Sequence, residues 1–144
     1  MTNYLKGMTA GLIATLVLSA LMVMKAMMGV MPGLDLPAII AGMMGMPGTP
    51  IVGWVVHFMI GIVLYGVAIV LSTPLLPGVS PIARGLIVGL SGWLVMMVML
   101  MPMAGVGMFG MHFGIMAPMM TLVLHLIFGA VLGWYYGRTV RSPA

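Results

Sequence analysis

Two histidines inside apolar segments are the residues of this sequence best suited to chemistry. His57 lies six residues and His125 seven residues into a long apolar run, and each is followed four positions later by a glycine, Gly61 or Gly129. An ionisable side chain within a membrane span indicates a functional site. Paired imidazoles at one depth are typical of b-type haem ligation, and a glycine one turn away leaves room for a flat macrocycle. The pair therefore predicts a haem b site between His57 and His125.

Other interpretations of the histidine pair remain open. A neutral histidine also hydrogen-bonds a carbonyl or a second histidine, and in this way holds two helices together. Because His57 and His125 occupy equivalent positions of an internal repeat, a duplication would copy a structural histidine as readily as a ligand. Contact with another metal ion or with a quinone is a third interpretation.

Methionine is the second chemical signal. Most of the 21 methionines fall in two windows, 22–46 and 96–120, which cover the outer half of a predicted span and the connection after it. Thioether clusters facing the periplasm suit Cu(I), because soft ligands select this ion. The sequence therefore predicts a Cu(I) site of Met43, Met111 and His112. The alternative is packing, since methionine is a flexible residue that fills irregular apolar gaps.

Composition indicates the kind of protein that must position these side chains. Of 144 residues, 63% are hydrophobic and 4% are charged, whereas soluble domains carry about a quarter charged residues. This composition predicts an integral membrane protein. The absence of cysteine and the single acidic residue, Asp35, exclude disulfides, thiolate chemistry and paired carboxylates. Five scattered basic residues form no continuous basic surface for nucleic acid, so we expect no nucleic-acid partner. Because thiolates and paired carboxylates are absent, we expect a binding protein rather than an enzyme.

Four apolar runs are long enough to cross a bilayer, which requires about 20 helical residues. The predicted transmembrane helices cover about residues 8–30, 51–71, 85–104 and 118–137. Connections rich in proline and glycine separate them. In the first connection, Asp35 followed by Leu36-Pro37 predicts a helix start, and we expect a short interfacial helix over about 36–45.

Charge predicts the orientation of the spans. Four crossings place both termini on one side, together with the connection between the second and third spans. Four of the five basic residues belong to that side: Lys6, Arg84, Arg138 and Arg141. By the positive-inside rule, both termini are expected on the cytoplasmic side. The membrane is expected to be the inner membrane of a bacterium.

The two halves of the chain resemble each other. Lys6-Gly7 and Gly11 match Arg84-Gly85 and Gly89, and His57 with Gly61 matches His125 with Gly129. Each unit, residues 6–72 and residues 84–138, crosses twice, so the two are parallel repeats. We therefore predict an all-α fold, an integral membrane four-helix bundle made of two parallel-repeat helical hairpins, in a single membrane domain over 1–144.

These motifs resemble those of uncharacterised families of small bacterial four-pass membrane proteins. The residues that carry the resemblance are Lys6-Gly7-x-x-x-Gly11, Arg84-Gly85-x-x-x-Gly89 and the paired His–x–x–x–Gly segments. The resemblance covers most of the chain. It implies the fold and the membrane location, and it implies no activity.

Taken together, the sequence predicts a small inner-membrane accessory or assembly subunit of a membrane redox complex, with haem b held by His57 and His125. Periplasm-facing Cu(I) binding or delivery is the alternative. A small transporter is a third interpretation, which the lack of a charged pathway within the spans disfavours. The expected partners are the lipid bilayer and either other membrane subunits or further copies of the chain.

Overall fold

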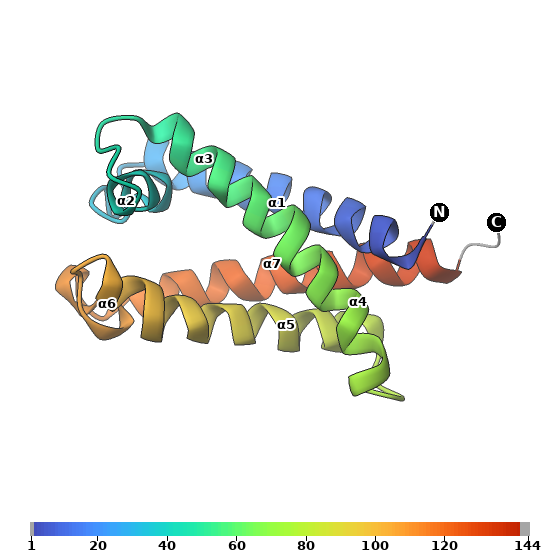
Figure 1. The fold of residues 1–144 in the computed structure, drawn as a ribbon. Helices are drawn as coiled ribbons and strands as arrows, with labels where there is room; N and C mark the ends of the chain where they lie inside the picture. Colours follow the sequence, from blue (N-terminus) through green and yellow to red (C-terminus); the bar gives the residue numbers. More distant parts are fainter. Residues whose placement is uncertain (1, 142–144) are drawn as a thin grey trace.

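The structure is a computed structural model that describes residues 2–141, and these fold into helices joined by short connections (Figure 1). The first long helix is α1 (Asn3–Met27), and the short α2 (Leu36–Met43) follows it. The second long helix has three parts, which are α3 (Pro50–Met59), the π-helical η1 (Ile60–Tyr65) and α4 (Gly66–Leu75).

The second half of the chain begins with a long helix that also has three parts. These are α5 (Pro81–Val95), the π-helical η2 (Met96–Leu100) and the short α6 (Met101–Met103). A 3₁₀ segment, η3 (Met108–Phe113), leads into the fourth long helix, α7 (Met116–Arg141).

Four helices are long and apolar enough to cross a membrane. They are Asn3–Met27, Pro50–Leu75, Pro81–Met103 and Met116–Val140, and we refer to them as the first to fourth spans. The predicted all-α membrane fold with four spanning helices is therefore confirmed for the described residues. The chain is a small multi-pass membrane protein.

Capping side chains decide where several helices begin. The side-chain oxygens of Thr2, Asp35 and Ser80 each accept a hydrogen bond from the backbone N–H three residues later, at 3.3, 3.1 and 3.3 Å. Such bonds satisfy backbone donors that a helix start leaves free. As a result, α1 and α5 begin several residues before the apolar runs that the sequence analysis used to place the spans.

Glycines set the closest contacts between the long helices. A side chain on Gly7 of α1 would collide with the carbonyl of Gly66, and a side chain on Gly85 of α5 would collide with the carbonyl of Gly129. Small residues let helix backbones approach closely in a membrane. Such contacts matter there because helix association depends on van der Waals packing and not on the hydrophobic effect. These contacts join the first span to the second and the third span to the fourth.

The second and third spans pack less closely than the other neighbours. α1 contacts η1, α4 and α7, and α5 contacts α7, whereas the main contact between the second and third spans joins α4 to α5. Figure 1 shows α3 diverging from α5 toward the end that carries α2 and α6. The start of α1 and the end of α7 lie at the opposite end, and the connection from α4 to α5 lies at that end too.

Candidate functional site

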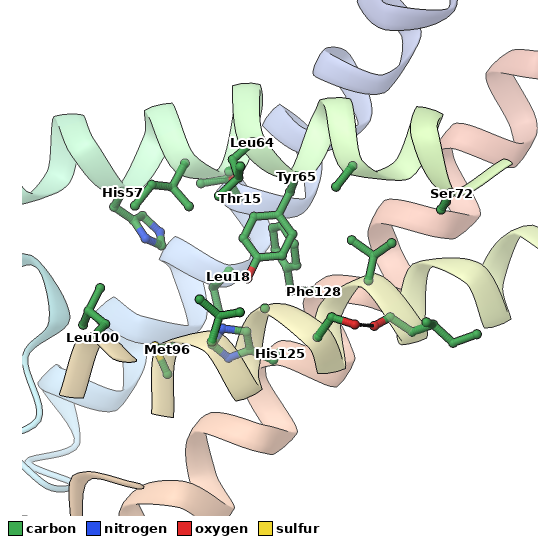
Figure 2. A pocket seen from close by; sticks show the side chains of 18 of the residues that line it. Thr15, Leu18, His57, Leu64, Tyr65, Ser72, Met96, Leu100, His125 and Phe128 are labelled. Carbon is green, nitrogen blue, oxygen red and sulfur yellow. Dashed lines mark hydrogen bonds between the residues drawn. The ribbon is translucent and has the colours of Figure 1, made fainter. Parts of the chain in front are cut away.

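A cavity of about 520 Å³ lies between the second and third spans (Figure 2). Residues of α3, η1 and α4 form one wall, and residues of α5 and η2 form the other. Thr15 and Leu18 of α1, Leu36 and Ile40 of α2, and His125 and Phe128 of α7 also line it. Small-molecule sites in proteins enclose about 300–1,000 Å³ and are mostly apolar with a few polar groups. This cavity has the size and the lining of such a site.

Both π-helical segments of the described chain lie at this cavity. The residues that line it are, in η1, Ile60, Gly61, Leu64 and Tyr65, and in η2, Met96 and Leu100. A π-helical turn inserts one extra residue into an α-helix, and such insertions occur frequently at functional sites. The two irregular segments therefore mark the same region of the fold as the cavity does.

His57 is buried on the cavity wall, with 7% of its surface exposed. Its Nε2 atom lies 3.4 Å from the hydroxyl oxygen of Ser19 in α1. The ring also meets Trp54 edge to face, with 5.7 Å between ring centroids. Within residues 2–141, Nδ1 of His57 has no hydrogen-bond partner. The ring is therefore positioned by α1 and by its own helix, and one nitrogen remains available.

His125 presents a single defined nitrogen to the cavity. Its Nδ1 atom lies 2.8 Å from the carbonyl oxygen of Thr121. A carbonyl only accepts, so Nδ1 carries the proton and Nε2 keeps its lone pair. Histidines that bind metals or ligands are commonly oriented by such a bond on the opposite nitrogen. The structure brings His57 and His125 to one cavity, and Figure 2 shows both rings there.

Tyr65 is a third polar side chain of the cavity, and the sequence analysis missed it. Its ring packs edge to face on Phe128, with 4.8 Å between centroids. Its hydroxyl fits beside Gly92 of α5, where any side chain would collide with it. Among the described residues this hydroxyl has no hydrogen-bond partner. A lone tyrosine deep in an apolar run was the available signal, since buried tyrosine hydroxyls normally find a partner.

The π-helical turn explains why Tyr65 shares a face with His57. Eight residues separate them, which in a regular α-helix would place them about 80° apart around the axis. One inserted residue within η1 removes about 100° from that rotation, which leaves them about 20° apart. The insertion therefore aligns the two polar side chains on the cavity wall.

Gly61 and Gly129 serve the packing of neighbouring helices. Gly61 lines the cavity, but a side chain on it would collide with the hydroxyl of Thr15. Gly129 packs against the backbone of Gly85. The space that the sequence interpretation reserved beside each histidine for a macrocycle is therefore filled by α1 and α5.

The predicted copper ligands lie on two different elements at the α2 and α6 end. Met43 ends α2, which packs on α3, whereas Met111 and His112 belong to η3, which packs on η2, α6 and α7. All three side chains are exposed. Met97 and Met101 are fully buried and pack the core at this end. Cu(I) binding by Met43, Met111 and His112 stays a prediction.

Haem b is only partly matched by the residues of the cavity. The two histidines lie on its wall, but the lining contains no lysine or arginine to pair with the two propionate carboxylates of a haem. Two cations of the first and third spans, Lys25 and Arg84, are bound elsewhere. The amine of Lys25 donates to carbonyls that include that of Leu34, at 2.8 Å, and the guanidinium of Arg84 donates to carbonyls that include that of Val79, at 3.0 Å. The cavity therefore fits an uncharged ligand better than haem b.

The fold and the site define a small, all-helical, multi-pass membrane protein with a ligand-sized cavity among its spans. The chain belongs to the family of unknown function DUF6789, whose family model matches residues 1–144. This membership confirms the predicted resemblance to an uncharacterised family. No curated protein and no solved structure matches the chain.

Proposed function

We propose that this protein is a membrane-embedded accessory subunit of a redox complex, and that it holds a lipid-soluble ligand between its second and third spans. The observation that carries the proposal is that His57 and His125 line one cavity of about 520 Å³, whose walls include both described π-helical segments. A chain with so little polar surface suits a role beside larger membrane subunits.

Free polar atoms favour ligand binding over a purely structural role of the histidines. Nε2 of His125 and the hydroxyl of Tyr65 belong to side chains of a largely apolar lining, and neither atom has a partner within the described chain. A polar group in apolar surroundings without a hydrogen bond costs about 1–3 kcal/mol. A bound ligand with a polar head group would satisfy both atoms.

The cavity is open to lipid along its side. Leu64, Ile87 and Val95 line it and are also exposed, with 63%, 42% and 56% of their surfaces accessible. The exposed surface of a spanning helix faces the acyl chains. A lipid-soluble molecule can therefore enter between the second and third spans without crossing water.

Extraction of the purified protein tests this proposal. The full chain is purified in mild detergent, and its bound compounds are extracted and measured by mass spectrometry. We expect one lipid-soluble compound in a near one-to-one molar ratio to the protein. This compound should be lost from a His57→Leu/His125→Leu variant whose helix content is unchanged. Equal amounts of every extracted compound in the two proteins would overturn the proposal.

The same preparation separates haem b from other ligands. A reduced-minus-oxidised visible spectrum of protein from a haem-replete host shows haem bands if the histidine pair ligates iron. Because the cavity lacks cations, we expect no such bands. Haem bands that disappear in the double variant would instead assign the cavity to haem b.

A further inference from the structure

We infer that the ligand is an isoprenoid quinone, with its head group bound between Tyr65 and His125. The inference rests on the proposed function, because it names the chemical class of the compound in the same cavity. Three properties of the cavity support it: its lack of charge, the donors and acceptors that it offers, and its long apolar walls.

The lining carries no residue of fixed charge. Its polar side chains are hydroxyls and imidazoles, and no lysine, arginine or aspartate lines it. A phosphate or carboxylate head group would lie there without a counter-charge, and an unpaired charge in apolar surroundings is strongly unfavourable. Fatty acids and phospholipids are therefore poor candidates, and a neutral head group is required.

Tyr65 and His125 offer complementary hydrogen-bonding atoms. The tyrosine hydroxyl donates, and the carbonyl oxygen of a quinone is a pure acceptor. Nε2 of His125 accepts, because Nδ1 donates to the Thr121 carbonyl. The hydroxyl of a quinol can donate to this nitrogen, whereas a quinone cannot. The site is therefore suited to both redox states, with Tyr65 binding either form and His125 favouring the quinol.

Tyr65 and His125 lie near each other at the cavity (Figure 2), so one ring with two oxygens is suited to contact both. Tyr65 packs on Phe128 at 4.8 Å between ring centroids, and Phe128 follows His125 by three residues on α7. Residues three apart in a helix are neighbours on one face, about 5–6 Å apart. A sterol-like alcohol has one hydroxyl, which would have to accept from Tyr65 and donate to His125 through the same oxygen, whereas a quinol has a separate oxygen for each group.

The remaining walls are suited to a prenyl chain. They run from the polar groups along both spans toward α4, and they consist largely of aliphatic side chains, which include Leu64, Leu75, Ile87 and Val88. Some of these side chains are also exposed to lipid. A prenyl tail can therefore leave the cavity sideways into the bilayer while the ring stays bound.

Tryptophan fluorescence of the full chain in lipid nanodiscs tests the inference. Decylubiquinone is the probe, because quinones quench tryptophan emission, and Trp54 lies against the His57 ring. Decylubiquinol, kept reduced without oxygen, then displaces the quinone and restores the emission. We expect saturable quenching and full displacement.

Two variants separate the roles of the binding groups. Tyr65→Phe is expected to weaken quinone binding about fivefold, the value of one hydrogen bond. His125→Leu is expected to weaken quinol binding about fivefold relative to quinone binding, a ratio that a merely structural role would not change. Tyr135→Phe alters a tyrosine outside the cavity and is expected to leave both affinities unchanged.

The outcomes distinguish this inference from the proposed function. If Tyr65→Phe and His125→Leu bind both probes as Tyr135→Phe does, the quinone inference is wrong. If decylubiquinone does not bind, and another neutral lipid is extracted in a histidine-dependent amount, the quinone inference fails and the proposed function stands. If no compound is extracted in a histidine-dependent amount, both fail.

Discussion

At the scale of single residues, the site depends on histidine rings that are oriented by hydrogen-bonding groups outside the cavity. The backbone carbonyl of Thr121 fixes the proton of His125, and the hydroxyl of Ser19 lies against Nε2 of His57. Each ring is thus oriented by a group that does not itself line the cavity. Such support lowers the entropy lost when a ligand is bound.

Gly92 determines where the Tyr65 hydroxyl can lie, and its replacement tests that position. In Gly92→Ala, the new methyl group would collide with the hydroxyl and push it aside. We expect the amount of copurified ligand to fall about two- to tenfold, because one hydrogen bond is lost. Gly42→Ala is the control, since a side chain there meets nothing within 4 Å. An equal ligand content in both variants would contradict the assigned role of Tyr65.

At the scale of elements, the glycine contacts and the π-helical turns have opposite effects. The glycines bring α5 and α7 together at backbone distance, whereas η1 and η2 widen their helices beside the cavity. The bundle is therefore tight between the third and fourth spans and open between the second and third.

Overpacking the tight contact is expected to destabilise the protein. In Gly85→Ala the added methyl group would collide with the Gly129 carbonyl, which is backbone and cannot rotate away. Such changes cost about 1–3 kcal/mol, so the thermal unfolding midpoint in detergent should fall clearly. Leu90→Ala on the same helix is the control, because Leu90 is 41% exposed and faces lipid. Equal unfolding temperatures of Gly85→Ala and Leu90→Ala would contradict the close contact between Gly85 and Gly129.

Lys25 holds the connection between α1 and α2. Its amine donates to the carbonyls of Val30, Met31 and Leu34, at 3.2, 3.0 and 2.8 Å. Lys25→Met removes these bonds, and we expect faster amide hydrogen exchange over residues 28–35. Lys25→Arg retains donors and should exchange as the parent does. Unchanged exchange in Lys25→Met would argue against this role.

The sequence predicts the elements of this fold better than it predicts the site. Long apolar runs and the cap at Asp35 are local signals, so the four spanning helices and the start of α2 follow from them directly. The cavity depends on π-helical insertions, which shift side chains around the helix axis and leave no mark in a 3.6-residue pattern. For this reason Tyr65 was missed, and the space beside Gly61 and Gly129 was assigned to a ligand although α1 and α5 fill it.

At the scale of the whole molecule, the basic residues still predict cytoplasmic termini, and cysteine labelling tests this orientation. Since the chain contains no cysteine, one introduced cysteine is the only target of a maleimide. We expect a membrane-impermeant maleimide to label Met44→Cys in intact spheroplasts and Thr2→Cys only after lysis. The reverse pattern would show that the protein is inserted the other way round.

Native mass spectrometry of the intact protein tests the central claim most directly. Protein released gently from detergent should carry one bound lipid-soluble compound in a one-to-one ratio, because His57 and His125 line a cavity of ligand size. The His57→Leu/His125→Leu variant, with the same helix content, should appear mainly as the bare chain. If the parent protein and the variant give the same spectrum, the cavity does not bind a ligand through these histidines.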